Sequence, residues 1–292
     1  MNADFLSTEN IPLSEVIHPL LKEHEVKLFV KRDDLIHPFI SGNKWRKLKY
    51  NIEEMKRQKK NMMLTFGGAY SNHILATAAA GNKFGFKTIG VIRGEARQEK
   101  NSVLKMAEDF GMQLHFITRE EYRKKETNEF MEKIKNAFGD FYPVPEGGTN
   151  ELSVKGCTEI AGEIKMDYTH ICCCCGTGTT LAGISISLSA GKKAIGFCVH
   201  KGGEPVEENI RQWTSARDNY TIIDDYHFGG FAKNTDKLKT FAHEFYMETD
   251  IPVEPVYTAK MFFGIFDLVR KNFFEPGSVL VALHTGGIHN HL

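Results

Sequence analysis

His170-Ile171-Cys172-Cys173-Cys174-Cys175-Gly176-Thr177-Gly178-Thr179-Thr180 is the stretch that decides the fold. Residues 170–174 form a short apolar run, which predicts a buried strand. A turn rich in glycine and threonine follows, and the apolar spacing of residues 179–190 predicts a helix. A buried strand that leads through a tight turn into a helix is the repeating step of α/β folds with a parallel sheet.

The same step recurs along the chain. Apolar runs predict strands at residues 27–31, 62–66, 88–92, 113–117, 141–144, 170–174, 194–199, 221–223 and 279–283. Helical spacing occurs between most of them, at residues 71–84, 101–110, 119–137, 150–165, 179–190, 204–215, 235–249 and 260–271. A helix near residue 44 carries Trp45, Leu48, Ile52 and Met55 on one face. So many strands exceed one sheet, and we predict a small domain of residues 51–154 and a large domain of residues 1–50 and 155–292.

Composition excludes several classes of protein. The 292 residues include 37 Lys and Arg against 37 Asp and Glu, so the formal net charge is zero. A nucleic-acid-binding protein needs a basic face, and we therefore expect no nucleic-acid partner. We expect no membrane association, because no apolar run approaches the length of a membrane span. The N-terminal residues lack the basic and apolar regions of a signal peptide, which favours a cytoplasmic protein.

Four consecutive cysteines, Cys172–Cys175, do not predict a metal site. Residues of a strand alternate between its two faces, so these four thiols cannot converge on one ion. We interpret them as small, buried, apolar residues. The sequence also has no HExxH motif and no Gly-x-Ser-x-Gly nucleophile elbow.

The turn after this strand has the composition of a phosphate cradle. Its glycines let the backbone approach a ligand, the helix that follows points N–H groups outward, and its threonines add hydroxyl donors. It lacks the Gly-Lys-Ser/Thr of a P-loop and the third glycine of the dinucleotide fingerprint. Two alternatives stay open: an ordinary tight turn, and an α/β protein that binds a nucleotide with this loop.

Two other polar segments stand where helices begin. In Gly67-Gly68-Ala69-Tyr70-Ser71-Asn72-His73, Ser71 or Asn72 can cap the next helix, whose N-terminus can hold a carboxylate. In Ser41-Gly42-Asn43-Lys44, the lysine lies in the first turn of a helix, where the helix dipole disfavours a cation and lowers its pKa. A nucleophilic lysine needs such a setting. A capped helix and a solvated lysine are the plainer interpretations.

Polar residues also mark two loops near the C-terminus. Tyr257 and Thr258 open a late helix, and Thr285 and Gly286 follow the last strand. A packed tyrosine and a glycine-rich turn explain them equally well when each segment is taken alone.

Together, these segments resemble the pyridoxal-phosphate (PLP) enzymes of the tryptophan-synthase β-like fold, also called fold type II. Within that family, they resemble the branch of 1-aminocyclopropane-1-carboxylate (ACC) deaminase and D-cysteine desulfhydrase. The resemblance runs from Lys31-Arg32-Asp33-Asp34 to His284-Thr285-Gly286-Gly287. Its most specific parts are Ser41-Gly42-Asn43-Lys44-x-Arg46-Lys47-Leu48, Gly67-Gly68-x-x-Ser71-Asn72-His73 and Pro145-Glu146-Gly147-Gly148-Thr149-Asn150. It implies three αβα layers with two open, twisted, mostly parallel sheets, and PLP as the cofactor.

The resemblance also implies the role of each site residue. Lys44 carries the cofactor covalently and moves protons, and Asn72 bonds its phenolic oxygen. Ser71, Asn72 and His73 bind the substrate, and Tyr257 lies near the departing group. The expected catalytic residues are Lys44, Ser71 and Tyr257. The other cofactor-binding residues are Gly176, Thr177, Gly178, Thr179 and Thr180 around the phosphate, and Thr258, Thr285 and Gly286 beside the ring.

Two of these residues help to choose the substrate. ACC deaminases carry Glu at the position of Thr258 and Leu at that of Thr285, and the glutamate keeps the pyridine nitrogen protonated. Threonine hydroxyls cannot supply that charge, so a weaker electron sink is expected, adequate for β-elimination of a good leaving group. This pair favours D-cysteine desulfhydrase, which converts D-cysteine to pyruvate, sulfide and ammonia.

Two alternatives remain within this family. One is ACC deaminase, which gives 2-oxobutyrate and ammonia. The other is a non-catalytic PLP-binding protein, because Phe231 stands about where the family often has a second active-site tyrosine. The family usually forms homodimers, and the resemblance implies the same here.

Overall fold

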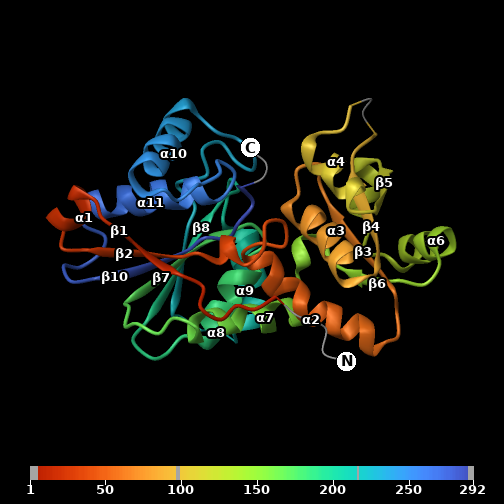
Figure 1. The fold of residues 1–292 in the computed structure, drawn as a ribbon, viewed down its shortest axis with the longest axis horizontal. Coiled ribbons are helices and arrows are strands. Elements are labelled where there is room, and N and C mark those ends of the chain that lie inside the picture. The colour runs from red at the N-terminus through yellow and green to blue at the C-terminus, as the bar shows by residue number, and fades with distance from the viewer. Residues whose placement is uncertain (1–5, 97–98, 216, 289–292) are drawn as a thin grey trace. The chain divides into compact units, whose positions relative to one another are not determined.

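The structure is a computed structural model that describes residues 6–96, 99–215 and 217–288. The chain divides into two compact units, each built around one β-sheet (Figure 1). Unit 1 contains Lys44–Ser153, and unit 2 combines Leu6–Asn43 with Val154–Leu292. The α/β class with two mostly parallel sheets is confirmed.

The sheet of unit 2 has the strand order β1-β2-β10-β7-β8-β9. Its strands are β1 (Leu13–Val16), β2 (Lys27–Lys31), β7 (His170–Cys175), β8 (Lys193–Cys198), β9 (Tyr220–Ile223) and β10 (Val279–Leu283). Strand β1 runs antiparallel to β2, whereas the other four neighbouring pairs are parallel. The carboxyl ends of β2, β10, β7 and β8 therefore meet at one edge, where ligands of α/β proteins bind.

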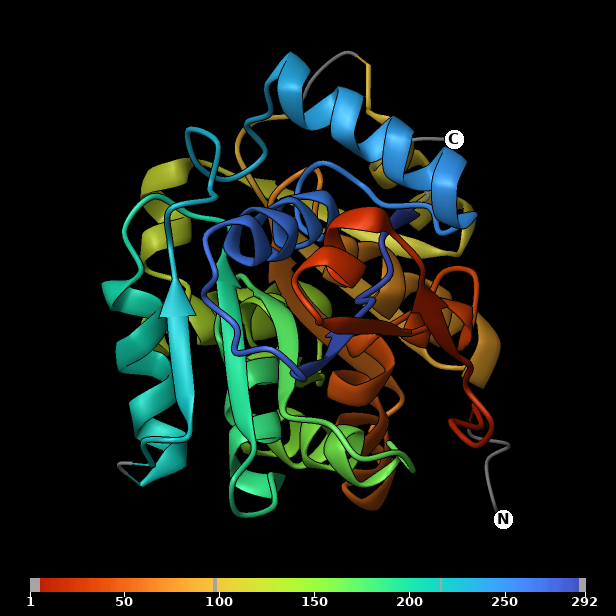
Figure 2. The ribbon, with the colours of Figure 1, turned by 90° about the vertical axis from the view of Figure 1, so that its left-hand side faces the viewer.

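Helices cover both faces of this sheet (Figure 2). One face packs against α1 (Pro19–Glu23), α10 (Asp236–Thr249) and α11 (Thr258–Arg270), and the other against α7 (Glu151–Gly162), α8 (Thr179–Ser187) and α9 (Glu204–Thr214). Cys172 and Cys174 belong to the first core, and Cys173 and Cys175 to the second. The predicted alternation of these thiols between two faces is confirmed.

Unit 1 holds a parallel sheet with the order β5-β4-β3-β6. Its strands are β3 (Met62–Gly67), β4 (Lys87–Arg93), β5 (Met112–Ile117) and β6 (Tyr142–Val144). One face packs against α3 (Asn72–Phe84) and α4 (Ser102–Asp109), and the other against α5 (Arg119–Arg123) and α6 (Asn128–Phe138). Two short 3-10 turns complete the pattern, one at Asp33–Leu35 in unit 2 and one at Glu146–Gly148 in unit 1.

Helix α2 (Asn43–Arg57) joins the two units along the chain. Its predicted apolar face is fully buried, and the Trp45 ring stacks on Phe84 of α3 with 5.6 Å between centroids. From Lys44 onward α2 therefore belongs to unit 1, which begins earlier in the chain than the small domain expected at residues 51–154.

The structure also departs from the sequence-based elements. The single helix predicted at residues 119–137 is wrong, because α5 ends at Arg123 and α6 begins at Asn128. The break follows from Thr127, whose hydroxyl accepts a hydrogen bond from the N–H of Phe130 and so starts a new helix. Short elements β1 and α1 were not predicted, because four or five residues carry too little periodicity.

Within the described residues, no helix combines the length and the apolar character needed to cross a membrane. The same part of the chain contains no group of three or more His, Cys, Asp or Glu side chains arranged to hold a metal ion.

Candidate active site

The predicted phosphate loop stands at the carboxyl end of β7. The strand ends at Cys175, and α8 begins at Thr179 after only three residues. The residue that precedes α8 is Gly178, whose φ of 82° is left-handed and whose position supplies no side-chain cap. The first N–H groups of a helix have no partner within the helix, so this terminus can bind an anion.

Threonine hydroxyls gather around the same terminus. The Oγ1 atoms of Thr177 and Thr179 lie 3.0 Å apart, and Thr179 and Thr180 are buried. The Nδ2 of Asn43 donates to Oγ1 of Thr180 at 2.9 Å. The five residues predicted for the phosphate loop therefore form one compact turn, and Asn43 is an additional member that the sequence analysis did not assign.

Tyr257 borders this loop. A Cβ added at Gly176 would lie 3.4 Å from Cε1 of Tyr257, so glycine allows the tyrosine ring to approach the loop backbone. The ring of Phe231 meets Tyr257 edge to face, with 5.8 Å between the centroids. Phe231, which stands about where the resembled family often has a second tyrosine, thus contacts the predicted active-site tyrosine.

The loop after β10 also lies in unit 2. A Cβ added at Gly42 would lie 2.1 Å from the carbonyl carbon of Thr285, and one added at Gly286 would lie 2.2 Å from Oγ of Ser41. The segment before α2 and the segment after β10 are therefore packed backbone against backbone. Thr258 is fully buried at the start of α11, directly after Tyr257, which borders the phosphate loop.

A buried carboxylate holds Thr258 in place. Oε1 of Glu254 accepts hydrogen bonds from the backbone N–H groups of Tyr257 at 2.9 Å and Thr258 at 2.7 Å, and Oε2 accepts one from Val256 at 2.8 Å. The Thr258 hydroxyl accepts from the N–H of Glu254 at 2.8 Å and lies 3.2 Å from its Oε1. Burial raises the pKa of Glu254 to about 7, against the lowering effect of these hydrogen bonds.

His284 links the loop after β10 to neighbouring segments. Its Nε2 lies 2.6 Å from the carbonyl oxygen of Pro252, and its Nδ1 accepts a hydrogen bond from the N–H of Gly286 at 3.2 Å. The carboxylate of Asp34, itself held by Arg32 at 2.7 Å, lies 3.6 Å from Nδ1. Burial lowers the pKa of His284, although Asp34 opposes this shift, so the ring is neutral with its proton on Nε2.

The predicted substrate loop lies in unit 1, between β3 and α3. Ser71 precedes α3, and its Oγ accepts a hydrogen bond from the N–H of Ile74 at 3.4 Å. Asn72 and His73 occupy the first turn of α3 and are both buried. The structure therefore places these three residues at one helix N-terminus, where a carboxylate is electrostatically favoured.

Among the residues that the structure describes, one ring nitrogen of His73 has no hydrogen-bond partner. Its Nε2 lies 3.0 Å from Oγ1 of Thr65, whose own proton is donated to the carbonyl oxygen of Val144 at 2.9 Å. Nε2 must therefore be the donor, which leaves Nδ1 as a buried acceptor without a partner. Burial and the positive charges of Lys47 and Lys44 hold the pKa of His73 well below its usual value.

Lys44 is the second residue of α2 and is half-buried. One helical turn on, Lys47 donates from Nζ to the carbonyl oxygen of Gly147 at 2.8 Å. A Cβ added at Gly148 would lie 3.1 Å from the His73 ring and 3.3 Å from Cβ of Lys47. Gly147 and Gly148, part of the motif at residues 145–150, therefore pack directly against the side chains of His73 and Lys47.

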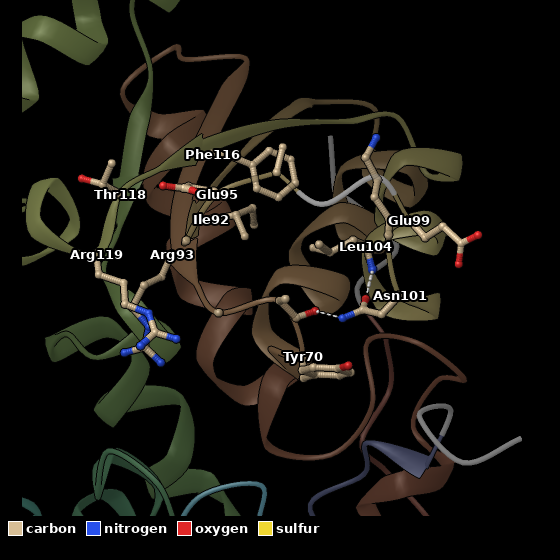
Figure 3. A pocket seen from close by; sticks show the side chains of 15 residues that line it. Tyr70, Ile92, Arg93, Glu95, Glu99, Asn101, Leu104, Phe116, Thr118 and Arg119 are labelled. Carbon is tan, nitrogen blue, oxygen red and sulfur yellow. Dashed lines mark hydrogen bonds between the residues drawn. The ribbon is translucent and has the colours of Figure 1, made fainter.

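A separate pocket of about 810 Å³ opens beside the substrate loop (Figure 3). It is lined by Gly68, Ala69 and Tyr70, and by residues at the carboxyl ends of β4 and β5. Asn101 caps α4 by accepting from the N–H of Leu104, and its Nδ2 donates to the carbonyl oxygen of Ala69 at 2.9 Å. This bond fixes the loop that leads to Ser71.

The predicted site residues thus fall into two sets, each compact within its own unit. Unit 2 holds the phosphate loop, Tyr257, Thr258, Thr285 and Gly286, and unit 1 holds Lys44, Ser71, Asn72 and His73. Glu254 was not predicted. The available signal was a charged residue in the otherwise apolar segment Ile251-Pro252-Val253-Glu254-Pro255-Val256.

Comparisons with known proteins agree over nearly the whole chain. A putative ACC deaminase of Pyrococcus furiosus is 29% identical over 89% of this chain and 84% of its own length. The bifunctional D-cysteine desulfhydrase/ACC deaminase of Arabidopsis thaliana is 29% identical over 90% of this chain and 72% of its own length. The crystal structure of an ACC deaminase homologue superimposes with a TM-score of 0.83, at 26% identity, over 99% of this chain and 92% of that one.

These similarities confirm the tryptophan-synthase β-like fold and PLP as the cofactor. Residues 8–286 match the family described as "Pyridoxal-phosphate dependent enzyme". A match over this length includes all the loops described above. The chain belongs to the family of pyridoxal-phosphate-dependent enzymes.

Proposed function

We propose that this protein uses PLP to release ammonia from a small amino acid, and that D-cysteine is its preferred substrate. The reaction removes the α-proton and the sulfur on the β-carbon, and consumes one water molecule. The products are pyruvate, hydrogen sulfide and ammonia. The observation that carries the proposal is the placement of Lys44 directly after Asn43, whose amide bonds the phosphate loop at Thr180.

The residues of unit 2 fit the phosphate end of the cofactor. A phosphate ester carries up to two negative charges and several acceptor oxygens. The N-terminus of α8 offers backbone donors without a side-chain cap, and Thr177, Thr179 and Thr180 add hydroxyl groups. We assign the phosphate to this loop of Gly176–Thr180 and the ring to the neighbourhood of Thr258, Thr285 and Gly286.

The residues of unit 1 fit the reactive end. We assign the covalent bond to Nζ of Lys44 and the phenolic oxygen to the amide of Asn72. PLP, when bound, withdraws electrons from the α-carbon of an amino acid joined to it. With its amine free, Lys44 would hold a base at Nζ that can take the α-proton of the substrate.

The N-terminus of α3 orients the substrate carboxylate. Ser71 supplies a hydroxyl, and the backbone N–H groups of Asn72 and His73 supply donors. The His73 ring takes no part in this binding as a donor, because its Nε2 proton is committed to Thr65 and its Nδ1 is an acceptor. We assign to the Tyr257 hydroxyl the role of orienting the departing sulfur and giving it a proton.

The preference for D-cysteine over ACC rests on Thr258. Its hydroxyl is engaged by the backbone N–H and the carboxylate of Glu254, so this position offers the ring a neutral group. A neutral partner for the pyridine nitrogen favours elimination of a good leaving group over the opening of a cyclopropane. The second candidate is ACC deaminase, which the Pyrococcus furiosus and Arabidopsis thaliana relatives support equally. A non-catalytic PLP-binding protein is the third, because of Phe231.

Turnover of the two substrates tests the proposal. Purified protein loaded with PLP is incubated with D-cysteine or with ACC, and pyruvate, sulfide and 2-oxobutyrate are measured. We expect a higher kcat/KM for D-cysteine. A higher value for ACC refutes the preference, and the absence of turnover on both supports the non-catalytic alternative.

Borohydride reduction tests the role of Lys44. Reduction should fix PLP covalently on the peptide that contains Lys44, and Lys44→Ala should abolish the adduct. Lys49→Ala, a change of a half-buried lysine in the same helix, is the matched control and should leave the adduct intact. An adduct of equal yield on another lysine in Lys44→Ala would refute the assignment.

We also propose that the protein works as a homodimer in the cytoplasm. The support for association is a set of exposed apolar side chains on one helix of unit 2, Tyr246 and Met247 of α10. The support for a reducing compartment is that all six cysteines are free thiols. Sedimentation analysis of the purified protein should give twice the chain mass of 33.0 kDa.

A further inference from the structure

Two buried charged residues flank the start of α11 and make no direct contribution to the proposed chemistry. Glu254 and Lys260 are each 1% exposed. A charge is rarely buried to this degree unless several hydrogen bonds compensate for the lost water. The groups that each one binds therefore indicate what it does.

Glu254 organises the turn before α11. Its two carboxylate oxygens accept hydrogen bonds from three successive N–H groups, those of Val256, Tyr257 and Thr258, at 2.7–2.9 Å. Its own carbonyl oxygen accepts from the N–H of Ala259 at 3.0 Å. One side chain thus satisfies the backbone donors around Tyr257, which precedes α11 and has no side-chain cap of its own.

Lys260 organises the turn on the other side of Tyr257. Its Nζ donates to the carbonyl oxygens of His227 at 2.8 Å and Gly230 at 2.9 Å. This turn contains Phe228 with φ of 52° and Gly230 with φ of 116°, and a left-handed phenylalanine is unfavourable unless the surroundings hold it. Phe231 follows directly.

The two turns meet at the aromatic pair. Phe231 contacts Tyr257 edge to face and stacks on His200 with 5.3 Å between the ring centroids. Tyr257 in turn borders Gly176 of the phosphate loop. Glu254 fixes the backbone that carries one ring, and Lys260 fixes the backbone that carries the other.

We infer that Glu254 and Lys260 are positioning residues that set the Tyr257–Phe231 wall of the site, and that this wall orients the side chain of the substrate. The inference rests on the proposed function, because it assigns Tyr257 to the departing group. It gives the two buried charges a role that neither the phosphate loop nor the substrate loop requires.

Two substitutions test the roles of Glu254 and Lys260 separately. Glu254→Gln keeps the size of the side chain but replaces one acceptor oxygen with an amide, and Lys260→Met keeps the stem and removes the three donors. Glu254→Asp is the conservative variant, since a shorter carboxylate can still accept N–H groups two and three residues on. Glu244→Gln on the exposed face of α10 is the control.

Amide hydrogen exchange of the PLP-loaded protein measures how firmly the backbone of each turn is held, independently of catalytic turnover. We expect exchange in residues 256–258 to accelerate about tenfold in Glu254→Gln, and exchange in residues 227–231 to accelerate similarly in Lys260→Met, because buried hydrogen bonds are lost locally. PLP content and the exchange of other peptides should match the wild type. Glu254→Asp should restore most of the protection, and Glu244→Gln should change nothing.

Kinetics with D-cysteine complete the test. We expect kcat to fall about tenfold or more in both variants while KM changes by less than about threefold, since the carboxylate loop is untouched. Unchanged local exchange with unchanged kcat would overturn the inference. So would faster exchange throughout the protein with a lower melting temperature, which marks a purely structural role. If the wild type turned over neither substrate, the proposed function would fail, whereas the exchange data would still decide whether the two turns are held as inferred.

Discussion

Thr258 illustrates how much one hydroxyl group can be constrained. It accepts a hydrogen bond from the N–H of Glu254, and among the described residues the acceptors for its proton are Oε1 and the carbonyl oxygen of Glu254, at 3.2 and 3.3 Å. A hydroxyl has one proton to give. Thr258 therefore cannot behave as a free donor toward a ligand while Glu254 is ionised.

This constraint leads to a prediction for the double substitution Thr258→Glu with Thr285→Leu. A glutamate at residue 258 would bring a carboxylate beside the proposed ring site and also close to the carboxylate of Glu254. We expect sulfide release from D-cysteine to fall at least about tenfold, because the electronic demand on the ring changes. Thr258→Ser with wild-type Thr285 keeps the hydroxyl and is the control. Undiminished D-cysteine turnover in the double variant would mean that these positions do not tune the reaction.

At the scale of elements, the segment before α2 and the segment after β10 depend on glycine. A methyl group added at Gly42 would lie only 2.1 Å from the carbonyl carbon and oxygen of Thr285, which is a severe overlap. Gly42 also has a φ of 59°, in the left-handed region. Neither backbone can give way without moving a strand end or a helix start. This packing fixes Asn43, and with it the start of the helix that bears Lys44.

We therefore expect Gly42→Ala to destabilise the protein strongly. Left-handed strain alone costs about 1–2 kcal/mol, and the backbone clash adds to it, for a total of roughly 3–5 kcal/mol. Gly277→Ala is a matched control in the same unit, with φ of 85° and no atom within 4 Å of the added methyl. Urea unfolding of both variants measures the difference. If Gly42→Ala and Gly277→Ala lowered the free energy of unfolding equally, the close approach of Gly42 to Thr285 would not contribute to the loss.

At the scale of the whole molecule, stability should fall in mild acid. His73 and His284 are buried and neutral, and their pKa values lie below that of a histidine in the unfolded chain. Below about pH 6.5 the unfolded chain therefore binds protons that the folded chain does not. Their stabilising contribution is complete above that pH and is lost as the pH falls toward the folded pKa.

His284→Gln tests this linkage, because glutamine can still donate to the Pro252 carbonyl oxygen but does not titrate. Between pH 6.5 and 5.5 the free energy of unfolding of the variant should fall less steeply than that of the wild type, by up to about 1.4 kcal/mol. Titration of Glu254, whose pKa is raised to about 7, changes the free energy of unfolding with pH in the opposite direction. Both proteins contain Glu254, so its contribution cancels in the comparison. Exposed His243→Gln should follow the wild-type slope. Parallel slopes for His284→Gln and the wild type would refute the prediction.

The sequence allowed some features to be predicted and not others. Strands and the alternation of Cys172–Cys175 follow from local periodicity, and glycine-rich turns mark where strands end. The break between α5 and α6 depends on one capping hydroxyl in a polar stretch, which periodicity does not detect. Glu254 and Lys260 were not recognised because their role depends on partners that only the fold brings together, such as the carbonyl oxygens of His227 and Gly230. The side-chain roles in the candidate site stay predictions.

The burial of the cysteines has a practical consequence. All six are shielded in the cores of unit 2. Burial raises the pKa of Cys172, and a hydrogen bond with Cys175, together with burial, raises the pKa of Cys173. The thiolate is the reactive form, so alkylating reagents should modify these residues only when the sheet opens. The rate at which an alkylating reagent labels them therefore reports the rate of global unfolding. Once exposed in air, adjacent thiols can cross-link, and heat inactivation of this protein should become reversible only when a reductant is present.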